Sequence, residues 1–248
     1  MKKPFNKLYT LAGERLKNDP SIIPWDVYPR PHLRRREWLN LNGLWELETE
    51  SGFKGKVRVP FPLESLLSGF EGKLRYGEKL LFRRCFSIPE GWRGKRVILN
   101  VGSVSRMHSV SVNGKFVCSS RSAYDSMTVD ITHLIKDENE IEIECVNDLD
   151  PTYPYGKQRI KRGGMWYTPC TGVWQTVWLE PVPDRPERYV KDIECRIEGS
   201  TVFFTVSGVW KGRLSHGQYS CRKPKDFILS MSRAYSSGSA GVHSPSEK

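Results

Sequence analysis

The residues best suited to bind a small polar molecule form one stretch near position 165. Gly163-Gly164-Met165-Trp166-Tyr167 places two aromatic rings directly after two glycines. Glycine lets the backbone turn sharply, and Trp and Tyr rings are amphipathic surfaces on which the faces of sugars can stack. We therefore take Trp166 and Tyr167 as candidate contacts for a sugar.

A basic run, Lys157-Gln158-Arg159-Ile160-Lys161-Arg162, comes just before these rings. It can attract a negatively charged sugar, or it can be a solvated loop with no binding role. Under the first interpretation, Arg159, Lys161 and Arg162 join Trp166 and Tyr167 as candidate substrate-binding residues.

Other tryptophans have the pattern of core residues. Trp174 and Trp178 lie four positions apart in a run typical of a strand, on the same face, where a large ring is more often core than ligand platform. Trp38 and Trp45 are also predicted to be core residues.

No residues are predicted to be catalytic. Hydrolysis of a glycosidic bond with retention needs two carboxylates about 5 Å apart. The Asn139-Glu140 pair lies in a turn that leads into a strand, and Glu142 and Glu144 share the outer face of that strand. The sequence has no Gly-x-Ser-x-Gly elbow, phosphate loop or paired-His motif, so no cofactor is predicted.

Metal binding is not predicted either. The six cysteines lack Cys-x-x-Cys spacing and the five histidines are isolated in sequence. The first thirty residues hold no continuous apolar run, so we expect no leader and no membrane span, and a cytoplasmic location with reduced cysteines that act as small core hydrophobes.

The net charge of +11 raises the alternative of nucleic-acid binding. Of the 39 basic and 28 acidic residues, 7 and 2 lie in residues 209–248, so nearly half of the excess is in the last forty residues. The sequence shows no basic stripe along the whole chain, so nucleic acid is not the partner that we expect.

Short strands with turns between them position the candidate substrate-binding residues. Alternation or continuous apolar character predicts strands over 43–48, 81–86, 96–101, 127–131, 140–146, 173–180, 192–197 and 201–206. Asn113-Gly114 between two alternating runs predicts a type I′ hairpin. Leu8, Leu11, Ala12 and Leu16 fit one helical face, which Gly13 weakens, and residues 63–67 can form one helical turn.

The fold class is therefore all-β, a jelly-roll-type β-sandwich over residues 40–183 after an extended N-terminal segment over 1–39. Pro181, Pro183 and Pro186 mark a domain boundary. Residues 187–208 begin an immunoglobulin-like β-domain that the remaining length cannot complete. We expect residues 209–248 to be disordered or frame-altered, a hypothesis that sequencing the gene across codons 205–215 tests.

Several segments together resemble the N-terminal sugar-binding domain of glycoside hydrolase family 2, a galactose-binding-like fold. Its closing segment is similar to residues 163–180, its opening to Tyr28-Pro29-Arg30-Pro31 and Trp38-Leu39-Asn40-Leu41-Asn42-Gly43-Leu44-Trp45, and its second segment to Val59-Pro60-Phe61-Pro62. Val112-Asn113-Gly114, Tyr124-Asp125 and Val129-Asp130-Ile131-Thr132 also follow in family order, so the resemblance runs over about residues 5–208.

The resemblance implies a part of an enzyme that hydrolyses β-galactosides or β-glucuronides, without the catalytic barrel of about 250 residues. It thus implies a carbohydrate partner and an inactive chain when alone. Some relatives have an aspartate before the Met-Trp pair that reaches the sugar, whereas this sequence has Gly164. A free-standing carbohydrate-binding module is the main alternative, and a nucleic-acid-binding protein is the second.

Overall fold

The computed structural model describes residues 9–182, 189–198, 201–210 and 213–221 of the chain. These residues form two compact units, which we call unit 1 and unit 2. Unit 1 combines the described residues up to Pro29 with Arg35–Val182, and unit 2 combines Arg30–Arg34 with the strands that follow Val182.

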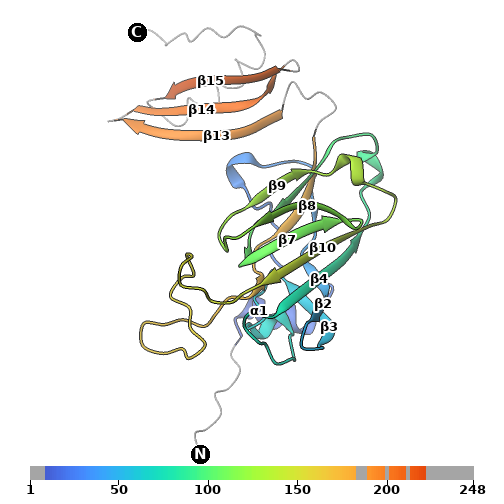
Figure 1. Cartoon of the computed structure of the whole chain (residues 1–248). Coiled ribbons are helices and arrows are strands. Elements are labelled where there is room, and N and C mark those ends of the chain that lie inside the picture. Colours follow the sequence, from blue (N-terminus) through green and yellow to red (C-terminus); the bar gives the residue numbers. More distant parts are fainter. Residues whose placement is uncertain (1–8, 183–188, 199–200, 211–212, 222–248) are drawn as a thin grey trace, which may run out of the picture. The chain divides into compact units, whose positions relative to one another are not determined.

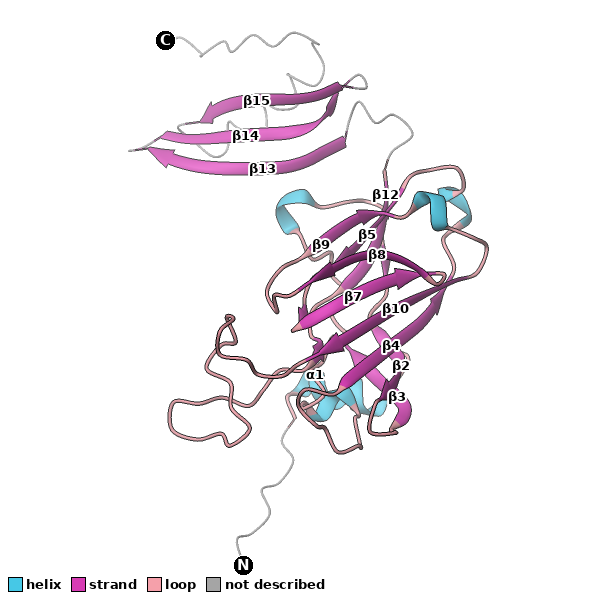
Figure 2. Ribbon diagram, viewed as in Figure 1, coloured by secondary structure: helices cyan, strands magenta, loops and turns pink. Residues whose placement is uncertain are grey.

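Unit 1 is a sandwich of two antiparallel sheets (Figures 1 and 2). The larger sheet has the strand order β3-β2-β4-β10-β7-β8 and the smaller β1-β12-β5-β9, while β6 pairs with β11. In chain order the strands are β1 (Leu39–Asn40), β2 (Gly43–Thr49), β3 (Lys54–Val59), β4 (Lys79–Phe86), β5 (Val97–Val101), β6 (Val104–Ser105), β7 (Met107–Val112), β8 (Lys115–Ser120), β9 (Met127–Asp130), β10 (Asn139–Val146), β11 (Gly172–Val173) and β12 (Val177–Pro181). The predicted all-β class is confirmed.

One α-helix and short 3₁₀ turns accompany the strands in the described part of the chain. They are α1 (Leu11–Asn18), η1 (Pro31–Leu33), η2 (Leu66–Ser68), η3 (Glu90–Trp92) and η4 (Thr132–Leu134). Helix α1 lies in the segment that the domain prediction treats as extended. Thr10 caps it by accepting a hydrogen bond from the Gly13 amide at 3.0 Å, and Leu16 is buried, which together outweigh the low helix propensity of Gly13.

The period of two in the sequence accounts for the sandwich core. In β10, Ile141, Ile143 and Cys145 are buried while the intervening glutamates face outward, as predicted. All five residues of β5 are buried, as its continuous apolar run predicts. The core cluster joins such residues from both sheets, so the hydrophobic contacts between the sheets hold the sandwich together.

Two turns depend on special backbone geometry. Asn113 and Gly114 have φ of 51° and 74° between β7 and β8, so the predicted hairpin is confirmed. Gly172 has φ of 94°, and a Cβ there would lie 2.7 Å from a ring carbon of Phe82. A glycine is therefore required where β11 approaches the core.

The N-terminal segment is bound to β12 through a buried carboxylate. Glu180 is 0% exposed, and its Oε2 accepts a hydrogen bond of 2.6 Å from the Tyr28 hydroxyl. The Arg35 guanidinium lies 3.6 Å from the other oxygen. A buried carboxylate with these partners fixes the path of the chain before β1.

The tryptophan predictions hold in part. Trp45 and Trp178 are buried, as predicted for core residues. Trp38 and Trp174 are only half-buried, and each makes a T-shaped ring contact, with Tyr28 and Tyr124 respectively. The predicted strand over 173–180 is also interrupted, since β11 ends at Val173 and β12 begins at Val177.

The prediction that the cysteines are small core residues is right for Cys145 and wrong for Cys85 and Cys195, which are exposed. Cys85 follows the alternation of β4, in which Phe82 and Phe86 face the core and Cys85 faces outward. Cys118 and Cys170 are half-buried, and burial raises the pKa of their thiols to about 11 and about 12.

Unit 2 contains a three-stranded antiparallel sheet with the order β13-β14-β15, formed by β13 (Tyr189–Glu198), β14 (Thr201–Trp210) and β15 (Arg213–Cys221). The first two contain the predicted strands. Strand β15 lies in the segment predicted to be disordered or frame-altered, and the prediction of disorder is wrong over 213–221. Backbone pairing along β14, from Val202↔Cys221 to Trp210↔Arg213, outweighs a weak side-chain pattern. The remainder of the predicted tail, residues 222–248, lies outside the described residues, and the immunoglobulin-like assignment stays a prediction.

None of the helices in the described residues is long and apolar enough to cross a membrane.

Candidate functional site

The predicted site residues lie on one long loop between β10 and β11. This loop, residues 147–171, extends away from the sandwich (Figure 2). Its two ends are joined, since Asn147 Nδ2 donates to Thr171 Oγ1 at 2.9 Å and the Thr171 hydroxyl donates to Glu64 at 2.6 Å. The loop is therefore closed at its base by buried polar groups.

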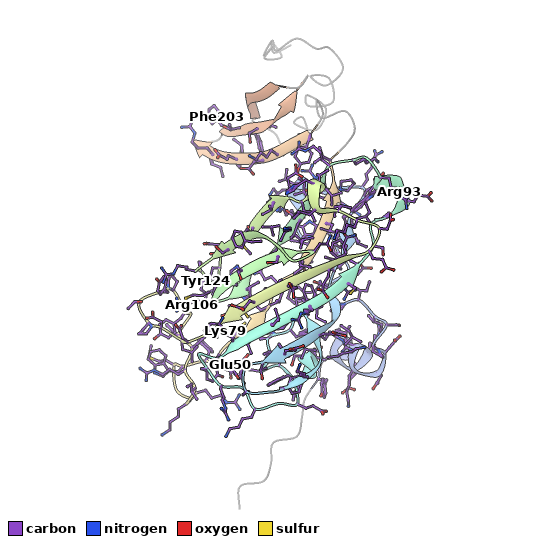
Figure 3. All side chains as sticks on the ribbon, turned by 45° about the vertical axis from the view of Figure 1, so that its right-hand side comes forward. Glu50, Lys79, Arg93, Arg106, Tyr124 and Phe203 are labelled. Carbon is purple, nitrogen blue, oxygen red and sulfur yellow. The ribbon has the colours of Figure 1, made fainter. Side chains whose placement is uncertain are left out.

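A buried arginine holds the first part of the loop. Arg106 Nε donates to Asp148 at 2.9 Å, and its Nη2 reaches both oxygens of the same carboxylate. The guanidinium carbon also lies 4.4 Å from the centroid of the Tyr153 ring. Arg106 lies toward the opposite end of the sandwich from Arg93 (Figure 3). This clamp is bidentate and stacked, a geometry that arginine provides and lysine does not.

The tip of the loop is ordered by its own backbone. The amide of Arg159 donates to the carbonyl of Tyr167 at 3.0 Å, and the amide of Tyr167 donates to the carbonyl of Lys157 at 2.9 Å. Gly163 and Trp166 exchange two hydrogen bonds of 3.2 Å each. Gly163 and Gly164 have φ of 139° and 59°, so the turn uses the conformational freedom of both glycines.

Two of the five candidate residues are in direct contact. The guanidinium carbon of Arg159 lies 3.7 Å from the centroid of the Trp166 ring, a cation–π stack. Trp166 is half-buried, whereas Tyr167 is 67% exposed. The loop therefore presents a fixed guanidinium plane on Arg159 and an open phenol ring on Tyr167, from two backbone segments that are hydrogen-bonded to each other.

The other two candidates differ from each other. Arg162 Nη1 donates to the hydroxyl of Thr168 at 3.0 Å, so this cation stabilises the turn as well as adding charge. Lys161 is exposed on the same turn. Sequence reasoning missed Arg106, Asp148 and Tyr153, because the clamp joins positions more than forty residues apart and no local pattern marks it.

Asn139 and Glu140, the Asn-Glu pair that is not predicted to be catalytic, have a structural role. Asn139 is buried, its Oδ1 accepts from the Lys136 amide at 2.8 Å, and its Nδ2 donates to the Lys136 carbonyl at 2.9 Å. Asn113 Nδ2 donates to the same Oδ1 at 3.0 Å, and Asn113 Oδ1 accepts from the Glu140 amide. The pair ties the β7–β8 hairpin to the turn before β10.

A second surface feature is a shallow hollow of about 280 Å³ on the larger sheet. It is lined by Leu44, Trp45, Glu46, Lys56, Arg83, Arg84, Cys85 and Glu140. Its charges are of both signs, and Arg83 already pairs with Glu48 and Glu142 at 2.9 and 2.8 Å. Because Trp45 is buried, the hollow offers no exposed ring face, and the loop remains the stronger candidate.

Within residues that the structure describes, no three His, Cys, Asp or Glu side chains gather closely enough to hold a metal ion.

Residues 70–175 match the family model described as glycosyl hydrolase 2 galactose-binding domain-like. This stretch is similar to the galactose-binding-like domain of family 2 glycosyl hydrolases. The match includes most of the larger sheet and the whole 147–171 loop, and the resemblance to family 2 seen in the sequence is confirmed by it. No curated protein sequence matches the chain.

Solved structures of β-glucuronidases share the fold of this chain. The enzyme of Dictyoglomus thermophilum is 18% identical with a TM-score of 0.52, over 78% of this chain and 34% of that chain. The Ruminococcus gnavus enzyme with D-glucaro 1,5-lactone is 18% identical with a TM-score of 0.55, over 79% and 39%. An enzyme from an uncultured Clostridium sp. is 15% identical with a TM-score of 0.52, over 78% and 35%. The chain thus spans between about a third and two fifths of the length of these structures.

Proposed function

We propose that this chain is the non-catalytic, sugar-facing N-terminal part of a family 2 glycoside hydrolase that acts on β-glucuronides. The family 2 match over residues 70–175 supports this role, and so does the shared fold with β-glucuronidases. β-Galactosides are the alternative substrate class for the parent enzyme. The partner of the site is a carbohydrate in both cases.

The Arg159–Trp166 stack is the observation that favours a uronic acid over a neutral sugar. A uronate combines an apolar ring face with a carboxylate, which suits an open aromatic surface close to a guanidinium. Because Arg159 covers one face of Trp166, the 67% exposed Tyr167 ring is the open surface. Arg159 lies 3.7 Å from the Trp166 ring, and the adjacent Lys157, Lys161 and Arg162 add positive charge. Asp148, near the base of the loop, is already neutralised by Arg106. The loop tip therefore attracts an anion.

A binding experiment on the intact chain tests the role of the loop. NMR titration with methyl β-D-glucuronide should show saturable binding that weakens about tenfold or more in the Arg159→Ala variant. Arg93→Ala is the matched control, because Arg93 is an exposed arginine at the opposite end of the sandwich (Figure 3). Equal affinity for methyl β-D-glucoside in the resonances of residues 147–171, or equal loss of glucuronide binding in both variants, would remove the uronate assignment.

The purified chain also tests whether the protein is non-catalytic and whether it is a free-standing carbohydrate-binding module. Pure chain should not hydrolyse 4-nitrophenyl β-D-glucuronide, and turnover that survives repeated purification would refute the proposal. Micromolar binding of a glycan by the chain alone would favour a free-standing carbohydrate-binding module instead.

A further inference from the structure

A strained tryptophan is displayed on the surface before β1, on a different segment from the 147–171 loop. Trp25 is 57% exposed, although the core tryptophans Trp45 and Trp178 are almost fully buried. Its φ is 55°, in the left-handed region that a bulky residue avoids. Neither feature contributes to stability, because an exposed ring gains no hydrophobic burial and this backbone angle is unfavourable for a bulky residue.

Buried asparagines hold this conformation in place. Asn42 is fully buried, and its Nδ2 donates to the Pro24 carbonyl at 3.0 Å and to Thr176 Oγ1 at 3.1 Å. Asn40 Nδ2 lies 3.4 Å from both the Trp25 carbonyl oxygen and Asp26 Oδ1. The backbone on both sides of the Trp25 ring is therefore fixed to the sandwich before any ligand arrives.

A second ring completes a corner. The Phe61 and Trp25 centroids are 6.5 Å apart with an angle of 74° between the ring planes. Phe61 is half-buried, and its amide donates to the Arg58 carbonyl at 3.2 Å. Asp26, the next residue after Trp25, is exposed and carries a carboxylate, which accepts hydrogen bonds but cannot donate them when ionised.

We infer that the Trp25–Phe61 corner, with Asp26, is a second carbohydrate site and that its ligand is a neutral pyranose. The apolar C–H face of a pyranose matches the open Trp25 ring, and its hydroxyls can donate to the Asp26 carboxylate. The carboxylate repels an anionic sugar, so this corner selects against the uronate that the 147–171 loop attracts. The inference does not rest on the proposed function, because it concerns different residues and a different ligand charge.

Saturation-transfer NMR on the intact chain tests the site, with methyl β-D-glucopyranoside and methyl β-D-galactopyranoside as probes. At least one should bind saturably, and the acyclic polyol D-mannitol should not bind. Trp25→Ala should weaken binding about tenfold or more, because it removes the whole ring face, and Trp25→Phe should weaken it less. Phe116→Ala is the matched control, since Phe116 is a 66% exposed ring on the β7–β8 hairpin, and it should leave affinity unchanged.

Four outcomes would overturn the inference of a neutral-sugar site at the Trp25–Phe61 corner. No binding of either glycoside up to about 50 mM would do so, as would a Trp25→Ala variant with wild-type affinity. Loss of neutral-sugar binding in Trp166→Ala but not in Trp25→Ala would assign the ligand to the loop. Self-association that Trp25→Ala abolishes, without sugar binding, would make the corner a protein contact. If Trp25→Ala fails to fold, the affinities of Trp25→Phe and Asp26→Asn for the neutral glycosides are compared with that of the wild type instead.

Discussion

At the scale of single residues, Asn139 shows how a polar side chain can be structural where a sequence motif suggests chemistry. Its side-chain amide accepts a hydrogen bond from the Lys136 amide and donates one to the Lys136 carbonyl, and it also accepts one from Asn113 Nδ2. These bonds fix the turn that leads into β10. We predict that Asn139→Ala lowers the free energy of unfolding by about 2–3 kcal/mol, because it leaves several buried partners unsatisfied.

Urea denaturation measures this change, and Glu140→Gln is the control. Glu140 is half-buried and its backbone amide, not its carboxylate, makes the bond to Asn113. We expect that control to change stability by less than about 0.5 kcal/mol. A larger effect of Glu140→Gln than of Asn139→Ala would contradict the structural explanation of the pair.

The cysteines provide a second prediction at this scale. Exposed Cys85 and Cys195 should be alkylated by iodoacetamide in the folded chain at about pH 8, whereas buried Cys145 should be protected. Cys118 should also react slowly, because burial raises the pKa of its thiol to about 11 and keeps it protonated at that pH. Peptide mapping by mass spectrometry compares the sites, and equal labelling of Cys85 and Cys145 would show that β4 and β10 are not packed as described.

Some residue roles could be predicted from the sequence and others could not. Alternation alone placed Ile141, Ile143 and Cys145 inside, because a strand has a period of two whatever its partners are. The same rule, taken with the position of Cys85 in β4, would have placed it outside. The roles of Trp25 and Arg106 depend on contacts with residues far away in sequence, which no local pattern encodes.

At the scale of elements, the 147–171 loop depends on Arg106. We predict that Arg106→Lys loosens the loop without unfolding the sandwich, because lysine cannot make both bonds to Asp148 or stack flat on Tyr153. Hydrogen exchange should speed up in residues 147–171, and stability should fall by about 2 kcal/mol. Arg93→Lys, which alters only an exposed pair, should change neither quantity.

The clamp also predicts a dependence on pH. Burial raises the pKa of the Asp148 carboxyl, but hydrogen bonds from Arg106 outweigh it, so the pKa lies below its ordinary value of 3.8. The stabilisation by the Arg106–Asp148 pair is therefore fully present above pH 3.8. It is lost as the pH falls through the lowered pKa of Asp148 in the folded state. The stability difference between wild type and Asp148→Asn should shrink when denaturation is repeated between about pH 6 and pH 2.5. A difference that grows on acidification would contradict the clamp.

Elements with strong local patterns were predictable, and elements built by tertiary contacts were not. The Asn113-Gly114 turn needs positive φ at both positions, so its sequence defines its shape. The folded conformation of residues 157–167 arises from backbone bonds between Arg159, Tyr167 and Lys157, which sequence cannot reveal. Strand β15 depends on pairing with β14 in the same way.

At the scale of the whole molecule, the two units differ in how well they bury apolar surface. Unit 1 closes a core between two sheets. In unit 2 the described side chains of β14, including Phe203, Phe204 and Val206, are only half-buried, and Ile197 on β13 is 70% exposed. A single three-stranded sheet cannot cover both of its faces, so the apolar residues of unit 2 favour association with another surface.

We therefore predict that the full chain self-associates and that ending it at about residue 185 gives a monodisperse protein with a cooperative melting transition. Unit 1 retains its whole core in the shorter chain, since its described residues end at Val182. Size-exclusion chromatography with light scattering compares the two forms over a range of concentrations. Phe204→Lys in the full chain should also reduce association, because it places a charge on the half-buried apolar surface of β14. A full chain that stays monomeric at all concentrations would mean that unit 2 covers its own apolar residues, and the prediction would then be wrong.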